Sequence, residues 1–156
     1  MSVALAGVLT LRPLPGWEVV RREQATVPLP SGGVISGEFA QLTRGSGVLD
    51  LLALQGVGGG ALELANLYAG EVLTSQLERL SVSDRVERIT LPTGLEAVRF
   101  GYIGSQPQTG AALEGSVTAV VAPSGNGVVF DGWASQGQLE LISEELDVMI
   151  ARADVV

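Results

Sequence analysis

The sequence predicts an α+β fold, with an antiparallel β-sheet flanked by two long helices. Short apolar segments are separated by turn-forming Gly, Pro, Asn and Ser residues, a pattern typical of antiparallel strands and hairpins. Apolar residues recur at three- and four-residue spacing in two segments only, as an amphipathic helix requires. Because these helical segments follow runs of strands rather than every strand, the pattern favours α+β over a parallel βαβ arrangement.

The first third of the chain is predicted to be extended. Residues 3–11 form a first strand, which the prolines and glycine of Pro13–Gly16 terminate. An extended segment restarts at residues 17–20. Residues 34–43 and 48–55 are then predicted to pair as a hairpin, because a Gly-rich loop of about four residues joins them.

The first helix is predicted at residues 61–80, and the second begins after residue 134. One face of the first helix would carry a mostly apolar stripe, which consists of Leu62, Ala65, Ala69, Val72, Leu73, Gln76, Leu77 and Leu80. Ser135 and Gln138 have the spacing of a capping box, in which two side chains bind free backbone amides at a helix start. The stripe of the second helix is Leu139, Ile142, Leu146, Met149, Ile150 and Ala153.

Two further hairpins are predicted between the helices. Residues 85–91 and 95–104 are joined by a Pro-Thr-Gly turn. Residues 113–122 and 128–134 flank a turn that contains Asn126 and Gly127. An Asn-Gly pair favours a hairpin because both residues accept a positive φ.

The absence of His, Cys and Lys removes most of the usual catalytic groups. No imidazole is present to act as a general base, no thiolate to attack, and no lysine to form a Schiff base. His and Cys, the ligands that zinc and copper prefer, are also absent. We therefore expect no enzymatic activity and no cofactor, and we assign no catalytic, cofactor-binding or metal-binding residue.

Charge and hydropathy narrow the possible partners and location. A net charge of −8 disfavours binding to nucleic acid, whose phosphates would be repelled. The sequence has no run of 18 apolar residues and no positively charged leader, so we expect no membrane insertion and a cytoplasmic location.

The length predicts a single domain over residues 1–156. All nine basic residues are Arg, which together with 21 Gly suggests a GC-rich bacterial genome such as that of an actinobacterium.

The strongest motif that suggests a ligand is Gly56–Ala61, which fits G-x-G-x-x-A between an apolar strand and a helix. Such a loop brings backbone close to a pyrophosphate in dinucleotide sites. The hairpins that follow it do not supply the parallel strands of a Rossmann fold, so a Gly-rich linker is the preferred interpretation.

Carboxylates and aromatic residues provide weaker candidates. Glu140 and Glu144 have i,i+4 spacing but lie opposite the apolar stripe, which favours a solvated helix face. Three glutamates on strands could converge but could equally face outward; they are Glu87, Glu96 and Glu114. Trp17 and Trp133 are expected to pack in the core.

The order of these elements resembles the PsbP-like superfamily, which includes the LpqN-type lipoproteins of actinobacteria. The resemblance spans nearly the whole chain, from Pro15–Trp17 through the hairpins and the first helix to the C-terminal helix. It implies an α/β/α sandwich around an antiparallel sheet. It also implies a mostly non-enzymatic role as an assembly factor, adaptor or chaperone-like partner, and it transfers no functional residue.

These observations predict a non-catalytic protein-interaction module. It would act as an adaptor or chaperone-like accessory factor of a larger assembly, associated with secretion or with a membrane. Its partner is expected to be a protein, with a homodimer as one possibility, and the partner-binding residues are unknown. One alternative is a carrier of an apolar small molecule between sheet and helix. A second alternative is a nucleotide-binding enzyme that uses Gly56–Ala61.

Overall fold

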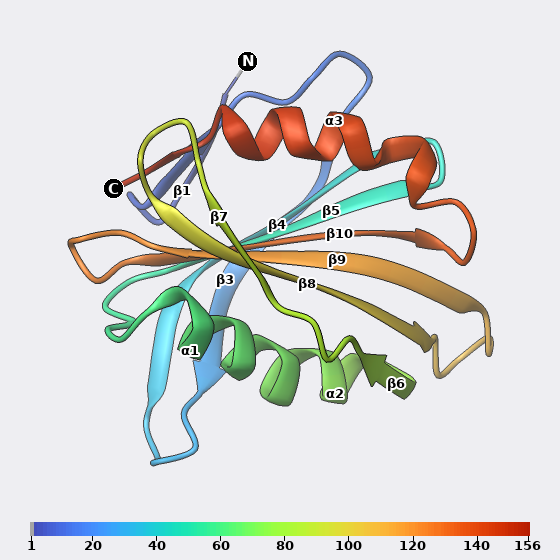
Figure 1. Cartoon of the computed structure of the whole chain (residues 1–156), viewed down its shortest axis with the longest axis horizontal. Helices are drawn as coiled ribbons and strands as arrows, with labels where there is room; N and C mark the ends of the chain where they lie inside the picture. The colour runs from blue at the N-terminus through green and yellow to red at the C-terminus, as the bar shows by residue number, and fades with distance from the viewer. Residues whose placement is uncertain (1) are drawn as a thin grey trace.

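A large antiparallel sheet organises the molecule, with helices on both of its faces (Figure 1). The computed structural model describes residues 2–156. The sheet has eight strands in the order β3-β4-β5-β10-β9-β8-β6, and β7 also pairs with β8. Its strands are β3 (Glu18–Pro28), β4 (Val34–Arg44), β5 (Gly47–Leu54), β6 (Glu78–Val82), β7 (Glu87–Thr90), β8 (Glu96–Ser105), β9 (Ala112–Val121) and β10 (Gly127–Ser135).

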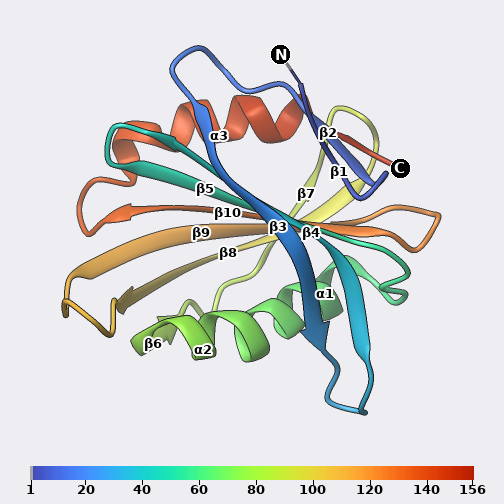
Figure 2. The ribbon, with the colours of Figure 1, turned by 180° about the vertical axis from the view of Figure 1, so that it is seen from behind.

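A separate three-stranded sheet joins the two ends of the chain (Figure 2). It contains β1 (Val3–Leu5), β2 (Leu9–Leu11) and β11 (Asp154–Val155). The prediction of one strand over residues 3–11 is therefore wrong. Ala6 and Gly7 adopt φ of 55° and 67°, which folds this segment back on itself. Val3 then pairs with Leu11, so apolar residues of both strands face the core.

The three predicted hairpins are confirmed. They are β4–β5, β7–β8 and β9–β10. In the last of these turns, Gly125 has φ of 90°, whereas Asn126 has no positive φ. Asn126 instead accepts a hydrogen bond from the Gly56 N–H (3.0 Å) and donates one to the Val156 carbonyl (2.9 Å). The positive φ of this turn therefore lies at Gly125, and the Asn126 side chain connects the turn to two other segments.

The expectation of two long helices is not met. The first helical segment covers residues 61–76, made of α1 (Ala61–Leu67), the π-helical η1 (Tyr68–Leu73) and α2 (Thr74–Gln76). It ends before residue 80 because Leu77 is extended and the chain continues into β6. The second helix, α3 (Glu140–Ala151), has 12 residues.

The capping box predicted at Ser135 does not form. Ser135 is the last residue of β10, and Gln138 contacts it only through a backbone N–H to carbonyl bond of 2.9 Å. The helix α3 begins after Leu139, without a side-chain cap. Its apolar stripe is nevertheless confirmed, since Ile142, Leu146, Met149 and Ile150 are buried.

Each face of the large sheet has its own apolar cluster. One face packs against α3 and the small sheet, and the other packs against the segment 61–76. Glycine permits close packing of the helices on the sheet: a Cβ on Gly132 would lie 2.4 Å from Leu146 of α3, and one on Gly127 would lie 2.8 Å from Leu64 of α1. Among the described residues, no helix has the length and apolar character needed to cross a membrane.

Candidate functional site

A carboxylate lies at the centre of the sheet, on the face covered by the segment 61–76. Asp131 is in β10 and is 2% exposed. Its Oδ2 accepts a hydrogen bond from the Tyr68 hydroxyl at 2.6 Å, and its Oδ1 accepts one from the Tyr102 hydroxyl at 2.7 Å. Tyr68 opens η1 and Tyr102 lies in β8, so Asp131 connects three elements.

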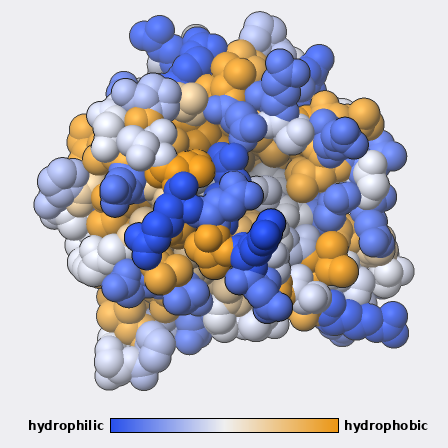
Figure 3. Space-filling view, in the orientation of Figure 1, coloured by the Kyte–Doolittle hydropathy of each residue, from blue (hydrophilic) through white to orange (hydrophobic). Residues whose placement is uncertain are grey.

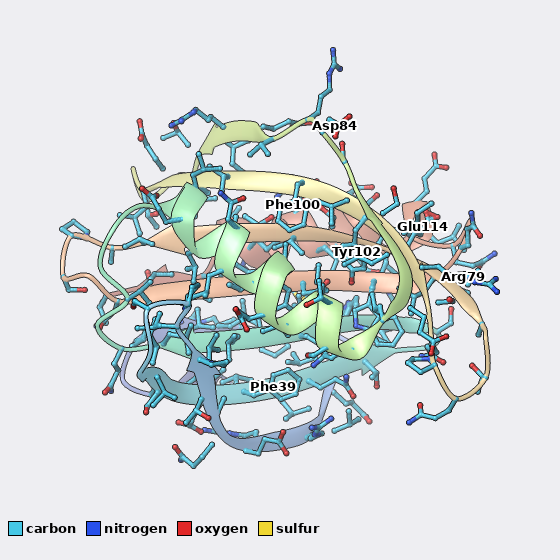
Figure 4. The ribbon with its side chains drawn as sticks, turned by 90° about the horizontal axis from the view of Figure 1, so that it is seen from below. Phe39, Arg79, Asp84, Phe100, Tyr102 and Glu114 are labelled. Carbon is cyan, nitrogen blue, oxygen red and sulfur yellow. The ribbon has the colours of Figure 1, made fainter. Side chains whose placement is uncertain are left out.

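Gly115 makes the Tyr102 contact possible. It lies in β9 directly opposite both Tyr102 and Trp133. A Cβ at this position would be 2.3 Å from the Tyr102 ring. The bare glycine therefore lets the ring extend from β8 across β9 to Asp131 on β10. Figure 4 shows Tyr102 and its neighbour Phe100 on this face of the sheet.

A second carboxylate lies beside the first. Asp50 of β5 is directly opposite Asp131 in the strand register and is 8% exposed. Its Oδ1 accepts a hydrogen bond from Gln41 Nε2 (2.8 Å), and its Oδ2 accepts one from Trp133 Nε1 (2.9 Å). We call Tyr68, Tyr102, Asp50 and Asp131, with Gln41 and Trp133, the buried carboxylate cluster.

Burial and the neighbouring charge change the acid strength of both carboxyls. Burial, followed by the charge of Asp50, raises the pKa of Asp131 to about 7, although the two tyrosine hydrogen bonds act in the opposite direction. Burial also raises the pKa of Asp50, against the effect of its bonds to Gln41 and Trp133. The pKa values of Tyr68 and Tyr102 are raised by burial and by Asp131, so both remain protonated donors.

Sequence reasoning did not single out this cluster. Neither the two tyrosines nor the two aspartates were among its candidates for a site. A signal was present, because Asp50 and Asp131 are each the single charged residue of a strand that is otherwise largely apolar. Of the two tryptophans expected in the core, Trp17 is 3% exposed, whereas Trp133 is half-buried and bound to Asp50.

The Gly56–Ala61 loop is held by contacts within the protein. The Gly56 N–H donates to Asn126, and the Gly58 N–H donates to the Gly125 carbonyl (3.1 Å). The Gly60 N–H donates to the Glu63 carboxylate at 3.1 Å. Glu63 thus places negative charge where a dinucleotide site would hold its pyrophosphate, so the geometry does not favour the nucleotide alternative.

The glutamates considered from sequence do not gather. Glu140 and Glu144 are exposed on α3, and Glu87 and Glu96 are exposed on β7 and β8. Glu114 accepts a hydrogen bond from the Gly137 N–H at 2.6 Å. Within residues 2–156, no three His, Cys, Asp or Glu side chains are grouped as a metal site.

An open groove of about 830 Å³ lies where α1 begins. Four segments line the groove: Gly58–Glu63, Arg88–Thr90, Gly94–Val98, and Val121–Pro123 with Gly125. By register, Arg88 is opposite Val98 and Thr90 is opposite Glu96, so their side chains share the α1 face. Glycine and small side chains make up much of the wall, which exposes backbone to a ligand.

Two solved structures resemble the chain over nearly its full length. The cyanobacterial PsbP (CyanoP) of Synechocystis sp. PCC 6803 has a TM-score of 0.50 and 12% identity, and the match covers 96% of this chain and 93% of that one. The chain has a PsbP-like fold. A protein of unknown function from Pseudomonas aeruginosa, PA94, has a TM-score of 0.51 and 13% identity, with 97% and 94% of the two chains covered. No family model and no curated protein matches the sequence.

Proposed function

We propose that this PsbP-like chain is a non-catalytic protein-interaction module, an adaptor or chaperone-like factor of a larger assembly, and that its docking surface is the groove at the start of α1. The observation that supports this most is the groove itself, since it is open to solvent and its wall offers backbone and small side chains. Such a surface suits a segment of another protein better than a small molecule that needs enclosure.

The strand β7 indicates how a partner would be held. It pairs with β8 on one side only. The Leu91 N–H bonds to the Leu95 carbonyl at 2.8 Å, so by alternation the backbone groups of Arg88 and Thr90 point away from β8. These groups are free to pair with an added extended segment, a common mode of peptide recognition.

The buried carboxylate cluster is not exposed to a substrate in this structure. Both oxygens of Asp131 are occupied by tyrosine hydroxyls, and the residue is 2% exposed. This sealed arrangement supports a structural role for the cluster, and so supports the non-catalytic proposal.

The carrier alternative has less support. The space between sheet and helical segment that is lined by Leu52, Leu64, Tyr68 and Val129 is too small for a water molecule. An apolar ligand would have to displace the helix to enter there.

Site-specific photo-crosslinking in the source organism tests the proposal. A photoreactive residue at Thr90 should form a defined adduct with one protein, whereas the same residue at the exposed Glu140 on α3 should not. Arg88→Glu should then weaken binding of the purified partner by about tenfold, because a groove charge is reversed. Equal adducts at both positions, or unchanged affinity of Arg88→Glu, would contradict the groove as the docking surface.

A further inference from the structure

The outer edge of β3 has no strand beside it. β3 is the end strand of the eight-stranded sheet described for residues 2–156, so β4 is its only strand neighbour there. Most of its 11 residues are exposed, and Figure 2 shows no other element in front of the strand. An open strand edge is a template for pairing with another chain. This edge is therefore a second interaction surface, on the opposite side of the sheet from β7.

Two hydrogen bonds show which backbone groups of β3 point outward. Just beyond the paired strands, the Leu29 N–H donates to the Gly33 carbonyl at 3.0 Å, so this pair is a hydrogen-bonded one. The Gln55 N–H donates to the Ser36 carbonyl at 3.0 Å, which turns Ser36 toward β5 and leaves Thr26 opposite it without a bond. Alternation along the strand therefore directs the backbone N–H and C=O groups of three residues away from β4: Arg22, Gln24 and Thr26.

The charges along this edge are already balanced within each copy. A guanidinium nitrogen of Arg21 lies 2.6 Å from a Glu23 oxygen, and one of Arg22 lies 3.1 Å from a Glu38 oxygen. Residues 24–37 carry no charge, and the end of their hairpin projects at the lower left of Figure 3 with white and orange residues. The net charge of −8 keeps two copies of the chain apart over most of their surface. The β3 edge is a neutral surface on which they can meet.

We propose that two copies of this chain associate edge to edge through β3, antiparallel, about a two-fold axis at Gln24. In this register Gln24 faces Gln24 of the second copy, and Arg22 faces Thr26 of the second copy, so the outward backbone groups of both strands bond to each other. Glu23 faces Ala25 of the second copy, and no charge lies directly opposite a like charge. The same surface is used by both copies, so the contact closes as a dimer.

Neighbouring registers are less favourable. An axis at Glu23 would set two carboxylates opposite each other, and an axis at Arg22 would set two guanidiniums opposite each other. The second of these would also need Val20, the residue that the β3–β4 pairing skips. An axis one or two residues beyond Gln24 would bring Pro28, which has no N–H, into the ladder. The paired stretch is therefore limited to residues 22–26, and we expect a weak, concentration-dependent dimer.

Cysteine cross-linking tests the register, because the chain has no cysteine of its own. Gln24→Cys should form a disulfide-linked dimer under mild oxidation, since residues directly opposite in an antiparallel pair lie within disulfide reach. Arg22→Cys and Thr26→Cys should each remain monomeric alone and cross-link when the two variants are mixed. Thr90→Cys, exposed on β7 at the other edge of the sheet, is the matched control and should not cross-link. Equal yields for Gln24→Cys and Thr90→Cys would overturn the proposal.

Sedimentation velocity over a range of concentrations tests the dimer in the protein without cysteines. The wild type should convert from monomer to dimer as its concentration rises. Gln24→Pro should weaken this association by about tenfold, because each copy loses one outward N–H while its bonds to β4 remain. Thr90→Pro, which removes an outward N–H from β7, should leave self-association unchanged. A wild type that stays monomeric throughout would contradict the proposal.

A second variant covers the case in which circular dichroism shows that Gln24→Pro does not fold. Gln24→Lys leaves the backbone intact and sets two ammonium groups opposite each other at the axis, so it should also weaken the dimer. Self-association that is unaffected by Gln24→Lys would overturn the inference. The inference goes beyond the proposed function, since the β3 edge lies apart from the groove and does not depend on what the groove binds.

Discussion

Single residues decide how the polar groups of the interior are satisfied. Gly115 has no side chain and so leaves room for the Tyr102 ring. Asp131 accepts hydrogen bonds from two tyrosine hydroxyls. The side-chain amide of Asn126 bonds to two segments that are distant from it in the sequence. In each case the side chain, or its absence, matters through a contact with residues far away in the sequence. Two predictions follow at this scale.

The first concerns the glycine beneath Tyr102. Gly115→Ala would force the Tyr102 ring away and disrupt its bond to Asp131, which should lower the free energy of unfolding by about 2–4 kcal/mol. Gly101→Ala on the adjacent strand is the control, because its Cβ would have only one neighbour, at 3.7 Å. Urea denaturation measures both, and equal losses would show that the Tyr102 contact is unimportant.

The second concerns the amide that holds the Gly-rich loop. Asn126→Ala leaves the Gly56 N–H and the Val156 carbonyl without their partner, at an expected cost of about 1–2 kcal/mol. The Gly56 amide should exchange faster with solvent. Asn66→Ala, an exposed site on α1, should leave stability and this exchange rate unchanged. An unaltered Gly56 exchange rate in Asn126→Ala would contradict the role given to the amide.

At the scale of elements, helix length was the property that sequence periodicity overestimated. The stripe of the first helix continues through Leu77 and Leu80, and both residues do pack against the apolar cluster. They do so from an extended segment and β6, where Glu78 pairs with Ser105 of β8. Strand pairing thus competes with helix propagation and wins, because an apolar residue is buried equally well from either structure.

The backbone at the start of β6 gives a prediction for this element. Arg79 has φ of 51° at an irregularity in the β6–β8 pairing, a left-handed conformation that costs a side chain about 1–2 kcal/mol. Arg79→Gly should therefore stabilise the protein by about 0.5–1 kcal/mol after glycine's own entropic cost. Arg85→Gly, where φ is not positive, should destabilise it slightly. Thermal unfolding distinguishes the two variants. A loss of stability in Arg79→Gly would show that the backbone at Arg79 is not strained.

At the scale of the whole molecule, the acidic charge and the buried carboxylates act together on stability. The net charge of −8 favours expansion at neutral pH. The raised pKa of Asp131 adds a cost that is absent below about pH 4, grows up to about pH 7 and stays constant above it. In the opposite direction, the lowered pKa of Glu38, held by the Ala6 N–H and Arg22, contributes stability that is lost at low pH.

The melting temperature should therefore rise as the pH falls from 8 to 5 and decline again at lower pH. Asp131→Asn should flatten the rise between pH 5 and 7, whereas Glu140→Gln, at an exposed helix position, should not. Thermal unfolding followed by circular dichroism measures this. A wild-type melting temperature that increases from pH 5 to 8 would contradict the raised pKa of Asp131.

Local patterns were sufficient for the class and for much of the order of elements. Turn residues and alternation placed the three hairpins, and the stripe of α3 named four residues that are buried. These features depend on neighbours in the sequence, so a linear reading reaches them. The PsbP-like fold was also reached from that order, and the two solved structures support it.

The buried carboxylate cluster and the groove depend on tertiary pairing instead. Asp50 and Asp131 are 81 positions apart in the printed sequence and meet only because β5 lies beside β10. Tyr68 joins them because its helical segment covers that face, and Tyr102 because Gly115 leaves room. Sequence periodicity indicates which face of an element is apolar. It does not indicate which elements pack together, and the burial that raises the pKa of Asp131 arises only when three elements pack around it.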